Sequence, residues 1–173
     1  SHEGNCSVAM WRASGAPAIL LECVFAVDCV APASLNIERF LSADPLYMIV
    51  NHDGKEVSAY HNAKELASYL EEAHASEILE HRHILDNLFP QMLRISREFA
   101  EKERPHLVAT AQQKASADLG EEIDRLRYLH SINNVVAEED IASATEELAE
   151  VQEYLSEMRV RLDAMRLIFK GDM

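Results

Sequence analysis

The residues that come nearest to a nucleotide-binding motif are Gly54 and Lys55. A phosphate-binding loop needs an earlier glycine whose amide helps to surround the phosphate, and a Ser or Thr directly after the Gly-Lys pair. Glu56 follows the pair here, and no glycine stands at the required spacing before it. Asp28 could act as the acidic partner of such a loop only if the loop existed. We therefore expect no ATP or magnesium site, and no ATP hydrolysis, in this chain.

Histidine and glutamate gather between positions 74 and 83, where a metal site would be conceivable. On a helix, residues two apart point about 200° away from each other, so His81 and His83 cannot share a face. His74 and His81 could share one with Glu77 or Glu80, but such patterns are typical of solvated helices. We expect no metal ligand among them.

The clustered carboxylates also have a structural explanation. Residues 138–140 are Glu-Glu-Asp, and negative charge is favourable where a helix begins. Glu22 lies in the middle of an apolar run, where an ion pair with an arginine is a better interpretation than a catalytic acid. No pattern places a nucleophile beside a base, so we expect no catalytic residue.

The charge balance favours protein partners over nucleic acid. The chain carries 30 acidic and 16 basic residues, a net charge of −14. A nucleic-acid-binding domain normally has a basic face, because its affinity comes largely from neutralised phosphates. A local basic patch at Arg94, Arg97, Lys102 and Arg104 remains an alternative. A protein with a basic surface is the more natural partner.

Composition and cysteine usage indicate a folded cytoplasmic protein. Hydrophobic residues make up 48% of the chain, and its three cysteines form no CxxC pair. Cys23 and Cys29 lie too far apart in one expected strand to form a disulfide, so we expect reduced thiols. Glu22, Asp28 and two prolines interrupt the longest apolar stretch, residues 16–33, so no membrane span is expected. The first residues show no secretory signal.

The first part of the chain, residues 1–61, is expected to be a β-rich subdomain. Odd positions from Ile19 to Cys29 are all apolar, which is the period of a strand with one buried face. A second apolar run, residues 46–50, is followed by Asn-His-Asp-Gly and then residues 55–60, a pattern that predicts a β-hairpin. We expect a small, mainly antiparallel sheet.

Helical patterns begin at Asn62, a plausible N-cap with Glu65 at the third helical position. Residues 62–90 are expected to form short helices, and Pro90 a first-turn residue of the next helix. Residues 91–165 are expected to form a long antiparallel helical hairpin, with a kink or a restart of the helix near Arg104 because Pro105 follows it. Residues 166–173 could return as a strand to the sheet. The expected fold class is therefore α+β.

The hairpin is predicted by a heptad stripe. Apolar residues from Ile141 to Met165 are separated alternately by three and four positions, and a shorter stripe runs from Leu119 to His130. Two such helices joined by the short connection 131–135 should pack antiparallel as a coiled coil. The pattern leaves open whether the seam closes within the chain or between copies. The expected seam, for packing or for interaction, consists of Leu119, Ile123, Leu126, Ile141, Leu148, Val151, Leu155, Met158 and Leu162.

Five stretches of the chain resemble one known family. They are residues 4–10, 20–32, 35–41, 119–141 and 161–168, in order and with compatible spacing. They are similar to the C-terminal region of the RapA family, helicase-like ATPases associated with bacterial RNA polymerase. Residues 42–45 and 59–100 match that family less well.

This resemblance implies a parent protein that binds RNA polymerase and uses ATP to promote its recycling. ATP and magnesium would belong to upstream motor domains that this chain lacks, and no functional residue carries over. We expect a non-catalytic docking or regulatory domain, with RNA polymerase or the parent's own ATPase domains as partner. The alternatives are a coiled-coil interaction or homodimerisation module, and a small enzyme with an acidic site.

Overall fold

The computed structural model describes residues 5–133 and 135–171, and these fold as α+β, as predicted. The chain forms two compact units. The sheet unit comprises Ser1–Ala26, Pro45–Lys102 and Arg161–Met173. The hairpin unit comprises Val27–Asp44 and Glu103–Val160. Each unit is thus assembled from segments that lie far apart in the sequence.

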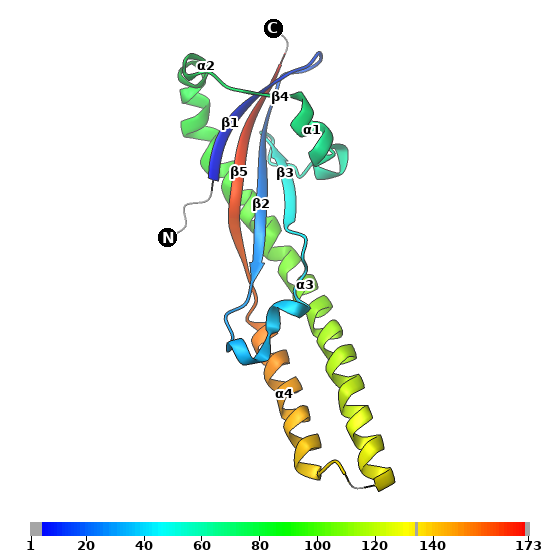
Figure 1. Ribbon diagram of the computed structural model, residues 1–173. Helices are drawn as coiled ribbons and strands as arrows, with labels where there is room; N and C mark the ends of the chain where they lie inside the picture. Colours follow the sequence, from blue (N-terminus) through cyan, green and yellow to red (C-terminus); the bar gives the residue numbers. More distant parts are fainter. Residues whose placement is uncertain (1–4, 134, 172–173) are drawn as a thin grey trace. The chain divides into compact units, whose positions relative to one another are not determined.

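The sheet has five strands in the order β3-β2-β5-β1-β4 (Figure 1). Strand β2 pairs antiparallel with β3, and β1 pairs antiparallel with β4 but parallel with β5. The expected C-terminal strand is therefore present, and it begins earlier than predicted. The strands are β1 (Asn5–Arg12), β2 (Ala18–Asp28), β3 (Leu46–Asn51), β4 (Leu70–Glu72) and β5 (Arg159–Gly171).

The alternation in β2 divides the core of the sheet unit between two faces. Leu21, Cys23 and Phe25 are buried on one face, on which Cys23 also contacts Ser96 of helix α3 (Arg82–Asn133). The other face carries Leu20, which packs with Ile49, Leu66 and Ile168. Both faces are covered at this point because each strand contributes apolar residues to both.

The β-hairpin predicted for residues 46–60 is not formed, because residues 55–60 are not a strand. Residues 55–60 provide only a single bridge, between Val50 and Glu56, followed by the 3-10 helix Ser58–Tyr60. The Ser58 hydroxyl accepts a hydrogen bond from the Ile49 amide at 2.8 Å, so a side chain takes the place of a continued ladder. The true antiparallel partner of β3 is β2.

Two short helices precede the long one. Helix α1 (Ala63–Tyr69) begins at Asn62, whose side-chain oxygen accepts from the Lys64 amide at 2.9 Å, so the predicted N-cap is confirmed. Helix α2 (Ala75–Glu80) follows β4, a strand that the helical pattern did not predict.

Helix α3 is one helix of 52 residues that continues through Pro90 and Pro105. The predicted start at residue 91, with Pro90 in the first turn, is therefore wrong. A proline inside a helix costs about 3 kcal/mol. Met92 and Ala100, which lie between the two prolines, are buried, and such burial stabilises the continuous helix. Residues 82–102 belong to the sheet unit and residues 103–133 to the hairpin unit.

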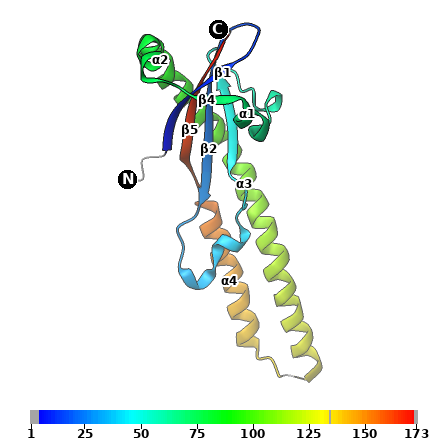
Figure 2. The same ribbon diagram turned by 45° about the horizontal axis from the view of Figure 1, so that its top comes forward.

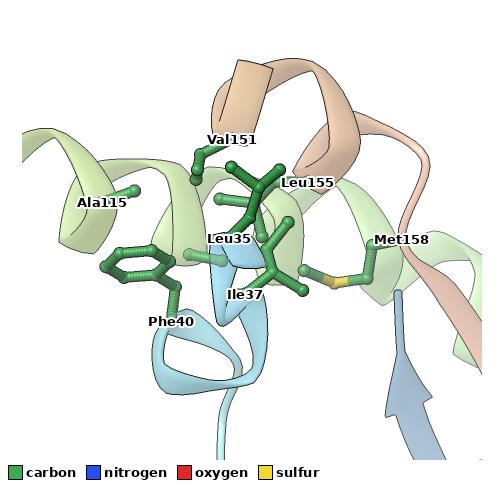
Figure 3. Packing of buried hydrophobic residues seen from close by; sticks show 8 residues of the cluster. Leu35, Ile37, Phe40, Ala115, Val151, Leu155 and Met158 are labelled. Atoms are coloured by element: carbon green, nitrogen blue, oxygen red, sulfur yellow. The ribbon is translucent and has the colours of Figure 1, made fainter. Parts of the chain in front are cut away.

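In the hairpin unit, helix α4 (Glu138–Ser156) lies antiparallel beside the second half of α3 (Figure 2). Two 3-10 helices, Ala33–Leu35 and Ile37–Phe40, pack against the same pair. Figure 3 shows the core they form together. Its buried members are Leu35, Ile37, Phe40, Ala111, Ala115, Val151, Leu155 and Met158.

Helix α4 ends at Ser156, so the prediction that the helix extends to residue 165 is wrong. Residues 159–163 read Arg-Val-Arg-Leu-Asp, which satisfies the period of a strand as well as the heptad spacing. The residues that continue this segment pair in parallel with β1, beginning with Ala164 opposite Asn5. This pairing favours the strand.

Candidate functional site

Most of the predicted seam lies inside the hairpin unit. On α3, Leu119 packs against the core, Ile123 is buried and Leu126 is half-buried. On α4, Val151 and Leu155 have no exposed surface. Two further predicted residues on α4, Ile141 and Leu148, are half-buried, and Met158 is buried just after the helix.

Leu162 is the exception. It lies in β5 and belongs to the sheet unit, so its assignment to the helical seam is wrong. A pair of glutamines that the stripe did not predict also joins the two helices. Gln112 and Gln152 each donate from the side-chain amide to the other's backbone carbonyl, at 3.2 and 3.0 Å. The seam therefore closes within the chain.

Three large apolar side chains remain exposed at the far end of this hairpin. They are Tyr128 (65% exposed), Ile132 (57%) and Val135 (79%), which we call the hairpin-end cluster. Tyr128 and Ile132 stand four residues apart on α3 and so share a helix face. Isolated exposed apolar residues are ordinary, but a group of them confined to one end of an element is typical of an interaction site.

The sequence interpretation treated residues 131–135 only as a connection. The available signal was that Tyr128, Ile132 and Val135 fall outside the heptad register. His130, expected at the edge of the seam, is half-buried, and its Nδ1 lies 2.6 Å from the Val136 carbonyl. This contact ties the end of α3 to the connection that carries Val135.

The surroundings of the hairpin-end cluster are acidic. Residues 121–140 contain six carboxylates and two arginines. Arg125 hydrogen-bonds Glu122 and thereby lowers the pKa of that carboxyl. Asp140 accepts from the Ala137 amide at 3.1 Å and so begins α4, as the helix-dipole interpretation of residues 138–140 expected. The cluster is thus an apolar patch in a negative field, which suits a partner surface with basic residues around an apolar centre.

The predicted ion pair of Glu22 is confirmed, and its partner is Arg166 on β5. Arg166 Nη2 lies 2.7 Å from Glu22 Oε1, and the Tyr47 hydroxyl donates to the other carboxylate oxygen. Burial, then the hydrogen bond to Glu22, raises the pKa of Tyr47. Among residues 5–133 and 135–171, Glu22 is the only carboxylate lining the adjacent cavity of about 260 Å³. This network links the neighbouring strands β3, β2 and β5 through side chains.

Gly54 and Lys55 form a tight turn in which Gly54 has φ +78°. The Lys55 amide donates to the Asn51 side chain at 2.9 Å, so this amide is already engaged within the turn. In the part of the chain that the structure describes, no group of three His, Cys, Asp or Glu could hold a metal ion. His81 instead lies against the Phe169 ring, with centroids 4.5 Å apart.

Within residues 5–133 and 135–171, no helix is both long enough and apolar enough to cross a membrane.

The three cysteines differ in environment, and this difference predicts their reactivity. Burial raises the pKa of the Cys23 thiol to about 11 and also raises that of Cys29, whereas Cys6 is exposed. Since the thiolate is the reactive form, we expect Ellman's reagent at pH 8 to label Cys6 first and Cys23 only on unfolding. Cys6→Ser should remove the fast phase. A fast phase that survives Cys6→Ser but disappears with Cys23→Ala would contradict this assignment.

Comparison with known proteins identifies the family. A family model described as "RNA polymerase recycling family C-terminal" matches residues 1–170, and the chain belongs to this family. The resemblance inferred from the five sequence stretches is thereby confirmed.

Curated relatives bear the name "RNA polymerase-associated protein RapA". The protein from Proteus mirabilis is 25% identical over 167 residues, and that from Pectobacterium carotovorum is 27% identical over 167 residues. In each case the match covers 95% of this chain but 17% of the relative. The chain therefore spans about one sixth of the length of these proteins.

Proposed function

We propose that this chain is a non-catalytic C-terminal module of a RapA-type, RNA polymerase-associated ATPase and that it docks on RNA polymerase through the hairpin-end cluster. The observation that carries the proposal is the exposure of Tyr128, Ile132 and Val135 at the end of a hairpin whose seam is otherwise covered. The names of the relatives supply the partner. ATP and magnesium would bind to the parent's motor domains, and a cytoplasmic location follows from the same proposal.

The chemistry of the cluster suits a contact of this kind. Tyrosine is enriched among residues that dominate binding energy, because it buries a large rigid ring and keeps one polar group. The acidic residues around the cluster would steer it toward a basic surface and would make association weaker at high salt. The same surface could instead contact the parent's own ATPase domains, which would make the module regulatory.

Homodimerisation through the heptad stripe has less support. Val151 and Leu155 are already enclosed by the 3-10 helices and by α3, so a second copy would find no free apolar stripe there. A dimer would have to use the hairpin-end cluster. Light scattering of the wild-type chain tests for a homodimer, and we expect it to show a monomer.

The proposal is tested by retention of this chain on immobilised bacterial core RNA polymerase. The variant Y128S/I132S/V135S removes the cluster, and the matched control Y60S/L79S/V30S removes a Tyr, a Leu and a Val that are also more than half exposed, elsewhere in the chain. We expect the first variant to weaken binding at least about tenfold, as loss of an interface centre does, and the control to bind like the wild type. Equal binding by both variants, or no retention of the wild type, would refute docking through this cluster.

A further inference from the structure

A groove of about 570 Å³ lies within the hairpin unit, on a part of the surface that the proposed docking does not use. One wall is a line of polar side chains on α3, His106, Thr110 and Lys114, which stand four residues apart and so share a face. Arg39 and Ser42, from the segment after β2, also line the groove. All five of these side chains belong to exposed residues.

The remaining lining of the groove is largely apolar. Phe40, Leu107, Ala111 and Met158 contribute to it, and three of these four belong to the buried core of the hairpin unit. The lining is therefore held in place by the packing shown in Figure 3. A volume of this size is in the range of clefts that bind small ligands or a few side chains of a peptide.

The groove holds two cations, Arg39 and Lys114. Arg39 and Lys114 have no carboxylate within ion-pair distance among the described residues, although acidic residues outnumber basic ones 30 to 16. The Arg39 guanidinium instead lies 4.5 Å from the centre of the Phe40 ring. Of the carboxylates that the structure describes, only Glu38 lines the groove. Two cations thus stand beside an apolar surface with their pairing capacity unused.

We propose that this groove binds a peptide segment in which an acidic side chain stands next to a large apolar one. The apolar side chain would lie against Leu41 and Leu107, the half-buried leucines of the lining, and the carboxylate would accept hydrogen bonds from the planar guanidinium of Arg39 and from Lys114. The Thr110 hydroxyl already donates to the His106 carbonyl at 3.0 Å, so it is oriented to accept from a peptide amide.

A peptide is favoured over a nucleic acid by the same observations. Binding of a single strand relies on exposed aromatic rings that stack with bases and on a track of several cations. Here the Phe40 ring is buried, and the groove has two neighbouring cations where a strand would need a track of several. The groove offers two charges at one place, which matches one or two carboxylates.

The test uses the whole 173-residue chain and a fluorescein-labelled peptide of three Asp-Leu-Phe repeats, followed by fluorescence anisotropy. The variant R39Q/K114Q removes both charges, and K55Q/K64Q removes two exposed lysines of the sheet unit as the matched control. We expect saturable binding by the wild type, weakening of at least about tenfold for R39Q/K114Q, and a change within about twofold for the control. An Asn-Leu-Phe peptide should bind as weakly as the variant does.

Two additions keep the result decisive. Lys114→Glu alone changes an exposed helical residue without touching Phe40, so it weakens binding even if the Arg39 change disturbs the fold. Poly(uridylic acid) is added as a competitor, and we expect it to leave the peptide bound. The proposal is overturned if the wild type shows no saturable binding, if both double variants bind alike, or if the polynucleotide displaces the peptide more effectively than unlabelled peptide does.

Discussion

Replacing Leu155 with alanine is expected to lower the free energy of unfolding by about 2–5 kcal/mol, the range for truncation of a large core side chain. Leu155 has no exposed surface and packs among Val151, Ala115 and the 3-10 helices (Figure 3). Truncation would leave a cavity in the core between α3, α4 and the 3-10 helices. Urea unfolding followed by circular dichroism at 222 nm measures the change, because both helices of the hairpin contribute to that signal.

Leu79→Ala is the matched control, because it is the same substitution at a position that is 66% exposed. We expect it to unfold close to the wild type. A second readout separates packing within the chain from packing between copies. If the seam closes internally, the unfolding midpoint stays constant as protein concentration is raised, whereas a dimer seam would shift it upward. Such a shift, or equal stability of the two variants, would contradict the internal seam.

The second large effect is expected for Arg166→Met, which leaves the Glu22 carboxylate without its cation. The Glu22 side chain is 9% exposed and that of Arg166 29%. Removing one partner of a buried pair costs about 3–5 kcal/mol, and the partial exposure of Arg166 places the expected loss near the lower end. The same urea titration at neutral pH measures the loss.

The double variant Glu22→Gln with Arg166→Met supplies the control for that experiment. It removes the charge that Arg166→Met leaves unpaired, so it should be more stable than Arg166→Met alone. Arg125→Met breaks the exposed pair with Glu122 and should have little effect. The network would be unimportant to the fold if Arg166→Met proved as mild as Arg125→Met.

The parts of the fold that could be predicted are those in which one local pattern dominates. Alternation in residues 18–30, the Asn62 cap and the stripe through Val151 and Leu155 each have one structural solution. Strand β4 could not be predicted in this way, because Leu70–Glu72 continues a helical pattern and becomes a strand by pairing with β1. The end of α4 was missed for a related reason, since residues 159–165 satisfy two periods and a distant strand decides between them.

The candidate sites were harder to predict from the sequence than the fold was. Sequence reasoning found that Glu22 needs an arginine, but the identity of Arg166 depends on the order of strands. The groove combines Arg39 with Lys114, which lie far apart in the sequence and meet only through packing of the 3-10 helices on α3. Exposure of Tyr128 and Ile132 depends on where the hairpin partner stops covering α3. Each of these properties is set by tertiary contacts.

The central claim, docking of the hairpin end on RNA polymerase, is tested most directly by photo-crosslinking. The full-length parent protein carries p-benzoylphenylalanine in place of Ile132, and it is irradiated in complex with core RNA polymerase. We predict a crosslink to a polymerase subunit that high salt reduces and that the same probe at Leu79 does not give. A crosslink from position 132 only to the parent's own ATPase domains would contradict docking and would assign the hairpin end to regulation of the motor.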